Sequence, residues 1–256
     1  MNLQNIFSEL EKVDGDVYDR LKHVSRRHMF SMIGRKAAAV AAPTVLASAL
    51  NKAYGQSLDP VVVEVLNFAL TLEYLESEYY NVGMDIPGLL TGTARTVYAQ
   101  IQKHENAHVK LLKSVLGGQA VEKPAFDFTA KGAFSNPFAN YDVYVLLSQA
   151  FEDTGVRAYK GQAPKLINND PILTAALQIH SVEARHAARV RELRGEKGYI
   201  TGNPGFPPGV YDGDESTRHL EISSLIPGVP FENATQAWDE PLSKEDVLKI
   251  VTPFLA

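Results

Sequence analysis

Glutamate, tyrosine and histidine occur in this chain in one pattern that is present twice. The first copy is Glu73, Tyr80, Glu105 and His108, and the second is Glu152, Tyr159, Glu183 and His186. The lone glutamate precedes its Glu-x-x-His pair by 32 residues in the first copy (73 to 105) and by 31 in the second (152 to 183). Four carboxylates and two imidazoles form a ligand set suited to a pair of redox-active metal ions.

The spacing within each Glu-x-x-His pair favours metal binding on a helix. Residues three apart lie on one helical face about a turn apart, so the carboxylate can bridge two ions while the imidazole binds one of them. Each lone glutamate, Glu73 or Glu152, would then complete one ion's ligands. Mixed oxygen and nitrogen ligation suits iron or manganese and would also hold zinc.

Both Glu-x-x-His pairs interrupt stripes of apolar residues that we expect to face a helical core. The stripe residues are Ala94, Tyr98, Ile101, Leu112 and Val115 around the first pair, and Ile172, Ala176, Ile179, Val190 and Leu193 around the second. Isolated charges in such a core cost several kcal/mol each, to order of magnitude. Two divalent cations would offset that cost for four carboxylates.

Three further residues accompany the ligand pattern. Tyr80 and Tyr159 each follow a lone glutamate by seven residues, which is nearly two helical turns, so we expect their hydroxyls to hydrogen-bond carboxylate ligands. Glu76 has Gly155 as its counterpart in the second copy. It is a candidate for a seventh, movable ligand or a gate for incoming ions, and a solvated or salt-bridged side chain is the alternative.

A competing motif overlaps the first pair. His104–His108 reads H-E-x-x-H, the signature in which two histidines bind zinc and the glutamate is a general base of a protease. The second copy has Val182 at the position equivalent to His104, and the protease interpretation leaves both lone glutamates without a role. We keep it as a remote alternative and interpret His104 and His180 as flanking residues.

Hydrophobic periodicity and capping residues predict an all-α fold. We expect helices over residues 59–84, 91–116, 141–166 and 169–195, with Pro60 and Asn169 at two of their starts. The short gaps predict two antiparallel hairpins, and the long segment 117–140 predicts a crossover between them. A loop-rich extension, residues 197–256, should end in a short helix that begins at the capping box of Ser243.

Composition and the N-terminal segment bear on the compartment. A net charge of −5 argues against a nucleic-acid partner, and the lack of cysteine excludes thiolate and iron–sulfur chemistry. The twin arginines of Ser25–Phe30 precede a weakly apolar run, residues 37–50, that is too short for a stable membrane span. We interpret residues 1–56 as a twin-arginine-type leader, which predicts the twin-arginine export machinery as a partner and a periplasmic or extracytoplasmic location.

Residues 57–196 resemble the ferritin-like superfamily, in the pattern of bacterioferritin and rubrerythrin. The resemblance rests on the two Glu-x-x-His pairs and on Leu66-Asn67 followed by Glu73 and Tyr80. Segments 66–70 and 150–155 are most similar to exported bacterial ferritin-like proteins related to plant desiccation-related proteins. The resemblance implies a ferritin-like four-helix bundle with metal ligands at six positions: Glu73, Glu105, His108, Glu152, Glu183 and His186.

We therefore expect an exported di-iron carboxylate protein that reacts with O2 or H2O2, with Fe(II) as a small substrate. A dimanganese, catalase-like enzyme is the nearest alternative, since the ligands do not separate iron from manganese. A metal-stabilised, non-enzymatic stress protein is a second alternative. The extension, absent from cage-forming ferritins, argues against a storage shell, and a homodimer is the assembly that we consider.

Overall fold

The computed structural model describes residues 58–215 and 227–256. The predicted export leader, residues 1–56, lies outside the described residues, so its role stays a prediction. Four long helices dominate the described part: α5 (Pro60–Asp85), α6 (Gly92–Leu116), α7 (Tyr141–Gln162) and α8 (Asp170–Leu193). No strand is present among the described residues, where Phe126 and Leu255 form an isolated bridge. The all-α prediction is confirmed.

Three of the four long helices, α5, α7 and α8, begin where a capping side chain accepts a hydrogen bond from a backbone amide of the first turn. The side chain of Asp59 accepts from Val61 N and is followed by Pro60 in the first turn of α5. Asn140 caps α7, and Asn169 caps α8 by accepting from Ile172 N. A short polar side chain at this position replaces hydrogen bonds that the first turn cannot make within the helix.

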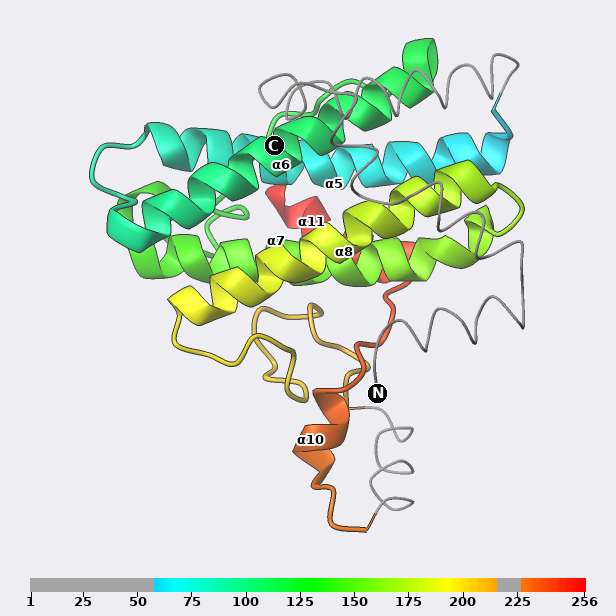
Figure 1. The fold of residues 1–256 in the computed structure, drawn as a ribbon. Helices are drawn as coiled ribbons and strands as arrows, with labels where there is room; N and C mark the ends of the chain where they lie inside the picture. The colour runs from blue at the N-terminus through cyan, green and yellow to red at the C-terminus, as the bar shows by residue number, and fades with distance from the viewer. Residues whose placement is uncertain (1–57, 216–226) are drawn as a thin grey trace, which may run out of the picture. The chain divides into compact units, whose positions relative to one another are not determined.

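The four helices form a bundle of two hairpins. Helix α5 packs along α6 and α7 packs along α8, with short connections in each pair (Figure 1). The long segment between them contains η1 (Gly117–Gln119) and η2 (Pro137–Ala139) and crosses from one hairpin to the other. This is the predicted topology, and it brings one face of every helix to a shared interior.

The remaining elements differ from the sequence prediction in two places. The predicted third helix, residues 141–166, ends as an α-helix at Gln162 and continues as the 3-10 helix η3 (Ala163–Leu166), where Pro164 removes a backbone donor. A five-residue helix, α10 (Phe231–Thr235), was not anticipated. The predicted terminal helix is α11 (Lys244–Val251), capped by Ser243 and followed by η4 (Thr252–Phe254).

The C-terminal extension is anchored to α7 by a buried arginine. Arg157 is fully buried, and its guanidinium donates hydrogen bonds to the carbonyl oxygens of Val210, Asp212 and Glu240 at 2.5 to 2.6 Å. One turn later, Gly161 admits the Leu242 backbone, because a Cβ at that position would collide with the Leu242 carbonyl oxygen. One face of α7 thus holds two separate stretches of the extension, residues 210–212 and 240–242.

A second buried polar network joins α7, α8 and the extension. Asp153 accepts from both terminal nitrogens of Arg191 and from the Tyr211 hydroxyl, which is 2.9 Å away. Gln149 donates to the same hydroxyl and accepts from Arg194. The pairing is consistent with the burial of Asp153 and Arg191, since an unpaired charge there would be strongly destabilising.

Within residues 58–215 and 227–256, no helix combines the length and the apolar character needed to cross a membrane.

We predict that Arg157→Met destabilises the protein by about 3 kcal/mol, since three carbonyl groups, of which that of Val210 is buried, would lose a charged donor. Urea denaturation followed by circular dichroism measures the change in the free energy of unfolding. Arg189→Met is the matched control, because Arg189 is exposed on α8 and, among the described residues, pairs with neighbouring Glu192. Equal stability of the two variants would show that Arg157 does not anchor the extension.

Candidate metal centre

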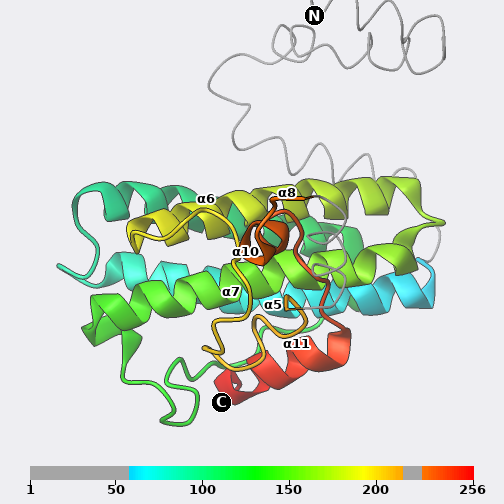
Figure 2. The ribbon, with the colours of Figure 1, turned by 90° about the horizontal axis from the view of Figure 1, so that it is seen from below.

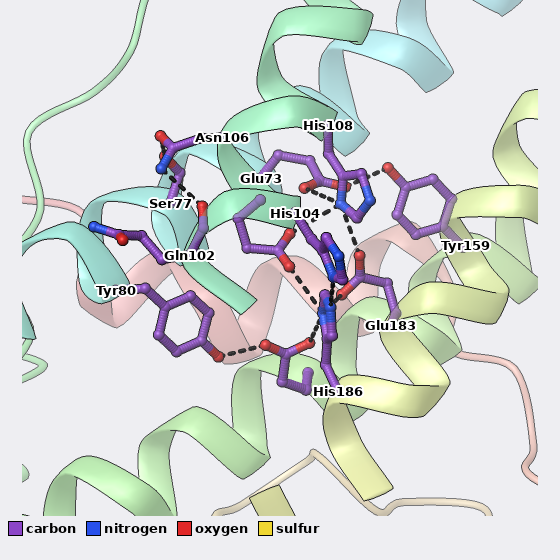
Figure 3. Close-up of polar contacts among 12 residues, drawn as sticks. Glu73, Ser77, Tyr80, Gln102, His104, Asn106, His108, Tyr159, Glu183 and His186 are labelled. Carbon is purple, nitrogen blue, oxygen red and sulfur yellow. Dashed lines mark hydrogen bonds and ion pairs between the residues drawn. The ribbon is translucent and has the colours of Figure 1, made fainter. Parts of the chain in front are cut away.

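The six residues predicted as ligands lie together in the interior of the bundle. Glu73 comes from α5, Glu152 from α7, and the two Glu-x-x-His pairs come from α6 and α8. All four carboxylate residues are 0% exposed, and the two histidines are buried. Figure 3 shows the polar atoms of Glu73, His108, Glu183 and His186 directed toward one another between the helices.

One half of the cluster is centred on His108. Its Nδ1 atom lies 3.2 Å from Glu73 Oε2, 3.0 Å from Glu105 Oε2 and 3.0 Å from Glu183 Oε1. One imidazole nitrogen and three carboxylate oxygens from three helices therefore converge on a single position.

The other half repeats this arrangement around His186. Its Nδ1 atom lies 2.8 Å from Glu105 Oε1, 3.2 Å from Glu152 Oε2 and 3.6 Å from Glu183 Oε2. Glu105 and Glu183 therefore present one oxygen to each half, whereas Glu73 and Glu152 each serve one half. In each half, four ligand atoms lie within 4.8 Å of one another. This is the geometry expected for two ions bridged by two carboxylates.

The two tyrosines hold the terminal carboxylates and do so across the repeats. The Tyr159 hydroxyl donates to Glu73 Oε1 at 2.6 Å, and the Tyr80 hydroxyl donates to Glu152 Oε1 at 2.5 Å. Each lone glutamate thus has one oxygen bound to a tyrosine of the other copy and its second oxygen directed at a histidine Nδ1. The tyrosines fix which oxygen is available as a ligand.

Burial and mutual proximity shift the pKa values of the cluster strongly. Burial raises the pKa of Glu73 to about 8 and also raises the pKa of Glu152. Burial alone would lower the pKa of both histidines, but the surrounding carboxylates raise that of His108 well above its usual range and that of His186 to about 12. Without cations the cluster therefore holds protons. Two divalent ions would balance the four negative charges with neutral imidazoles.

Several ligand atoms lack partners within the described part of the chain. Glu105 Oε1, Glu152 Oε2, both Glu183 oxygens and His186 Nδ1 are buried with no hydrogen-bond partner there. Their contacts with each other are short, but they do not have the geometry of hydrogen bonds. Buried polar atoms are normally satisfied, so converging atoms of this kind fit a bound cation. The donor set matches the metals named from the sequence, iron and manganese.

The geometry gives no support to the zinc-protease alternative. His104 is in neither ligand group, and its Nδ1 lies 2.8 Å from His186 Nε2, while its Nε2 lies 2.6 Å from the Gln100 amide. It therefore contacts a ligand from outside instead of sharing an ion with His108. This agrees with its interpretation as a flanking residue.

The other sequence candidates lie beside the cluster. Glu76 is 3% exposed, but it belongs to neither ligand group, so the structure does not place it as a seventh ligand. Burial, followed by the charge of Glu183, raises its pKa well above the usual range. His180 is on α8 and is likewise in neither group.

Fold and site together define a four-helix bundle with a buried carboxylate–histidine cluster that is compatible with metal binding. The family model described as a ferritin-like domain matches residues 62–196, more than half of the chain, and the chain belongs to that family. No curated protein matches the chain. The closer resemblance to exported desiccation-related relatives stays a prediction.

Sequence reasoning did not find the residues that support the centre from a distance. Each tyrosine bonds the lone glutamate of the other repeat. This pairing depends on how the two hairpins face each other, and the residue spacing within one copy does not predict it. The sequence did contain a signal for Asp153 and Arg157. Both are charged and lie close to Glu152 in a helical segment whose other residues are mostly apolar or small, which indicates buried, paired charges.

We predict different metal losses for bridging and terminal glutamates. Glu105→Gln should reduce binding of both ions, because Glu105 contributes an oxygen to each half, whereas Glu73→Gln should reduce binding at the His108 half only. Elemental analysis after dialysis at equal free metal gives the ions per chain. Glu64→Gln, a surface change at the Lys244 ion pair, is the control. Loss of one ion in both variants would contradict the shared role of Glu105.

We also predict that metal binding releases protons and weakens as the pH falls. The pKa values of both histidines and Glu73 are raised in the metal-free protein, so at pH 7 these groups hold protons that an incoming cation displaces. Titration with Mn(II) at pH 6 and pH 8 should give the tighter binding at pH 8, with protons detected by an indicator dye in weak buffer. Equal affinity at both pH values would contradict this prediction.

Proposed function

We propose that this chain binds two iron ions at the Glu105–Glu183 bridge and oxidises Fe(II) with O2 or H2O2. The observation that supports the proposal is the paired geometry, in which each histidine Nδ1 meets three carboxylate oxygens and two glutamates serve both halves. Two Fe(II) ions supply the two electrons that reduce one H2O2, with two protons, to two waters.

The protein's own residues would hold the ligands in place and keep the centre dry. The Tyr80 and Tyr159 hydroxyls fix the terminal carboxylates, and the fully buried carboxylates are surrounded by apolar side chains of all four long helices. Glu105 and Glu183 offer one oxygen to each half, so they would be able to change how they bind as the charge on the ions changes. Burial raises the pKa values of Glu73 and Glu152 in the metal-free protein, so these two groups would take up protons if the ions left.

Manganese in place of iron would make a catalase-like site, since the same oxygen and nitrogen ligands suit both metals. The two activities differ in their products. Oxidation of Fe(II) consumes one H2O2 per two ions and stops when Fe(II) is exhausted, whereas disproportionation releases one O2 per two H2O2 and continues. Export by the predicted leader is a separate prediction, which fractionation of cells that express an Arg26→Lys/Arg27→Lys variant would test.

The test uses metal-free protein loaded without oxygen with two equivalents of Fe(II) and then mixed with H2O2. We expect oxidation of both ions, faster than that of free Fe(II), at one H2O2 per two Fe(II), followed by stopped-flow absorbance. The Glu105→Gln variant should lose the acceleration and the Glu64→Gln variant should keep it.

A second sample, loaded with Mn(II), is assayed for sustained O2 release, and that result would replace the iron assignment with the catalase-like one. Two tightly bound ions without turnover of either kind would contradict both enzyme assignments and favour a metal-stabilised structural protein.

A further inference from the structure

The outer nitrogen of one ligand histidine contacts another histidine. His186 directs its Nδ1 atom at the carboxylates, and its Nε2 atom lies 2.8 Å from the Nδ1 atom of His104. The two rings are nearly parallel, with 15° between their planes and 5.0 Å between their centroids (Figure 3). Among the described residues, the Nε2 atom of the other ligand histidine, His108, has no hydrogen-bond partner. The two halves of the centre therefore differ in what lies behind their imidazoles.

This contact joins the two helices that supply the Glu-x-x-His pairs. His104 is on α6 and His186 is on α8, and these helices pack against each other on the face of the bundle opposite α11 (Figure 2). Gln100 is one turn before His104 on α6, and its amide lies 2.6 Å from His104 Nε2. A chain of contacting side chains thus runs from the exposed Gln100 through the half-buried His104 to the buried His186.

Metal binding at His186 would fix the direction of the hydrogen bonds in this chain. An imidazole that binds an ion through Nδ1 carries its hydrogen on Nε2. At 2.8 Å that N–H donates to His104 Nδ1, so the hydrogen of His104 is on Nε2, and the Gln100 amide accepts it with its oxygen turned toward the ring. Ligand histidines are usually held by a carboxylate, a backbone carbonyl or a water, so a second histidine is an unusual partner.

The second repeat contains this arrangement with one residue missing. A glutamine occurs five residues before the bridging glutamate in each repeat, as Gln100 and Gln178. The residue directly before the bridging glutamate differs, because it is His104 in the first repeat and Val182 in the second. A valine side chain cannot accept a hydrogen bond from His108. The outer amide is thus present in both repeats, and the histidine that connects it to a ligand is present in one.

We propose that His104 is a positioning residue that makes the His186 half the tighter of the two metal sites. By accepting from Nε2, it fixes the tautomer and the ring orientation in which His186 Nδ1 is free to bind an ion. His108 must reach the same state without such a partner. This inference rests on the proposed function, to which it adds the order in which the two halves fill, with the His186 half first.

Two substitutions separate hydrogen bonding from packing. His104→Asn keeps an acceptor, because the asparagine oxygen is as many bonds from the backbone as Nδ1 is, whereas His104→Leu keeps a similar volume without an acceptor. His180→Leu is the matched control. His180 is a half-buried histidine of α8 that is in neither ligand group, and its Nε2 atom has no hydrogen-bond partner among the described residues.

The first readout is the affinity for each ion, measured by titrating metal-free protein with Co(II) against a competing chelator. The two ions should bind with different affinities. His104→Leu should weaken the tighter ion by about 10- to 100-fold, the usual effect of removing a partner of a ligand histidine, and leave the other unchanged. His104→Asn should restore most of the affinity, and His180→Leu should bind as the unmodified protein does. Equal affinities in the leucine and asparagine variants at position 104 would overturn the proposal.

The second readout reports on the hydrogen bond itself. In proton NMR spectra of the Co(II)-loaded protein, the imidazole N–H of each bound histidine is shifted far outside the usual range, and its exchange in D2O can be followed. One N–H should exchange slowly, and His104→Leu should make it exchange roughly tenfold faster, the effect of one lost hydrogen bond. Packing alone would be kept by leucine and would leave this rate unchanged, which would contradict the proposal.

A gain-of-function variant tests the same inference in the other half. Val182→His should complete the missing chain between Gln178 and His108, slow the exchange of the second N–H and tighten the weaker ion. Two ions bound equally tightly, and unaffected by His104→Leu and Val182→His, would overturn this inference alone. Failure of the unmodified protein to bind two ions would instead refute the proposed function, so the two failures are distinguishable.

Discussion

The structure depends on the need to balance four carboxylates in the interior of a helical bundle. Buried charges of one sign are too costly to remain uncompensated, and the two histidines alone supply at most two positive charges. Protons can offset the charge, as the raised pKa values of Glu73 and Glu152 indicate, but two divalent cations offset it fully. The four helices must therefore hold their ligands at a spacing that suits ions, and the anchored extension helps to keep α7 and α8 in place.

The centre is built from two copies of one motif, but its two halves have different surroundings. His186 is contacted by His104 and, through it, by Gln100, whereas position 182 in the second repeat is a valine and offers His108 no such partner. Glu76 and Gly155 break the symmetry a second time, on the side that α11 covers. Internal repetition thus supplies the ligands, and the departures from it give each half a distinct environment.

The fold and the ligand positions could be predicted from the sequence because both are encoded by local spacing. Apolar periodicity located the helices, Asn169 marked the start of α8, and the three-residue step placed each histidine beside its glutamate. Features that depend on packing between distant segments were not predictable in this way. The bonding of Tyr80 and Tyr159 to glutamates of the other repeat and the seating of the extension on Arg157 both arise from how the hairpins and the extension meet.

The most direct test of the account is anomalous X-ray diffraction at the iron absorption edge from crystals of iron-loaded protein. The account predicts two peaks, about 3.5 to 4 Å apart as in other two-metal sites, one next to His108 Nδ1 and the other next to His186 Nδ1. A single peak shared by His104 and His108 would contradict it, because that ion would belong to the H-E-x-x-H motif. Absence of any peak among the four carboxylates would show that protons, not metal ions, balance their charge.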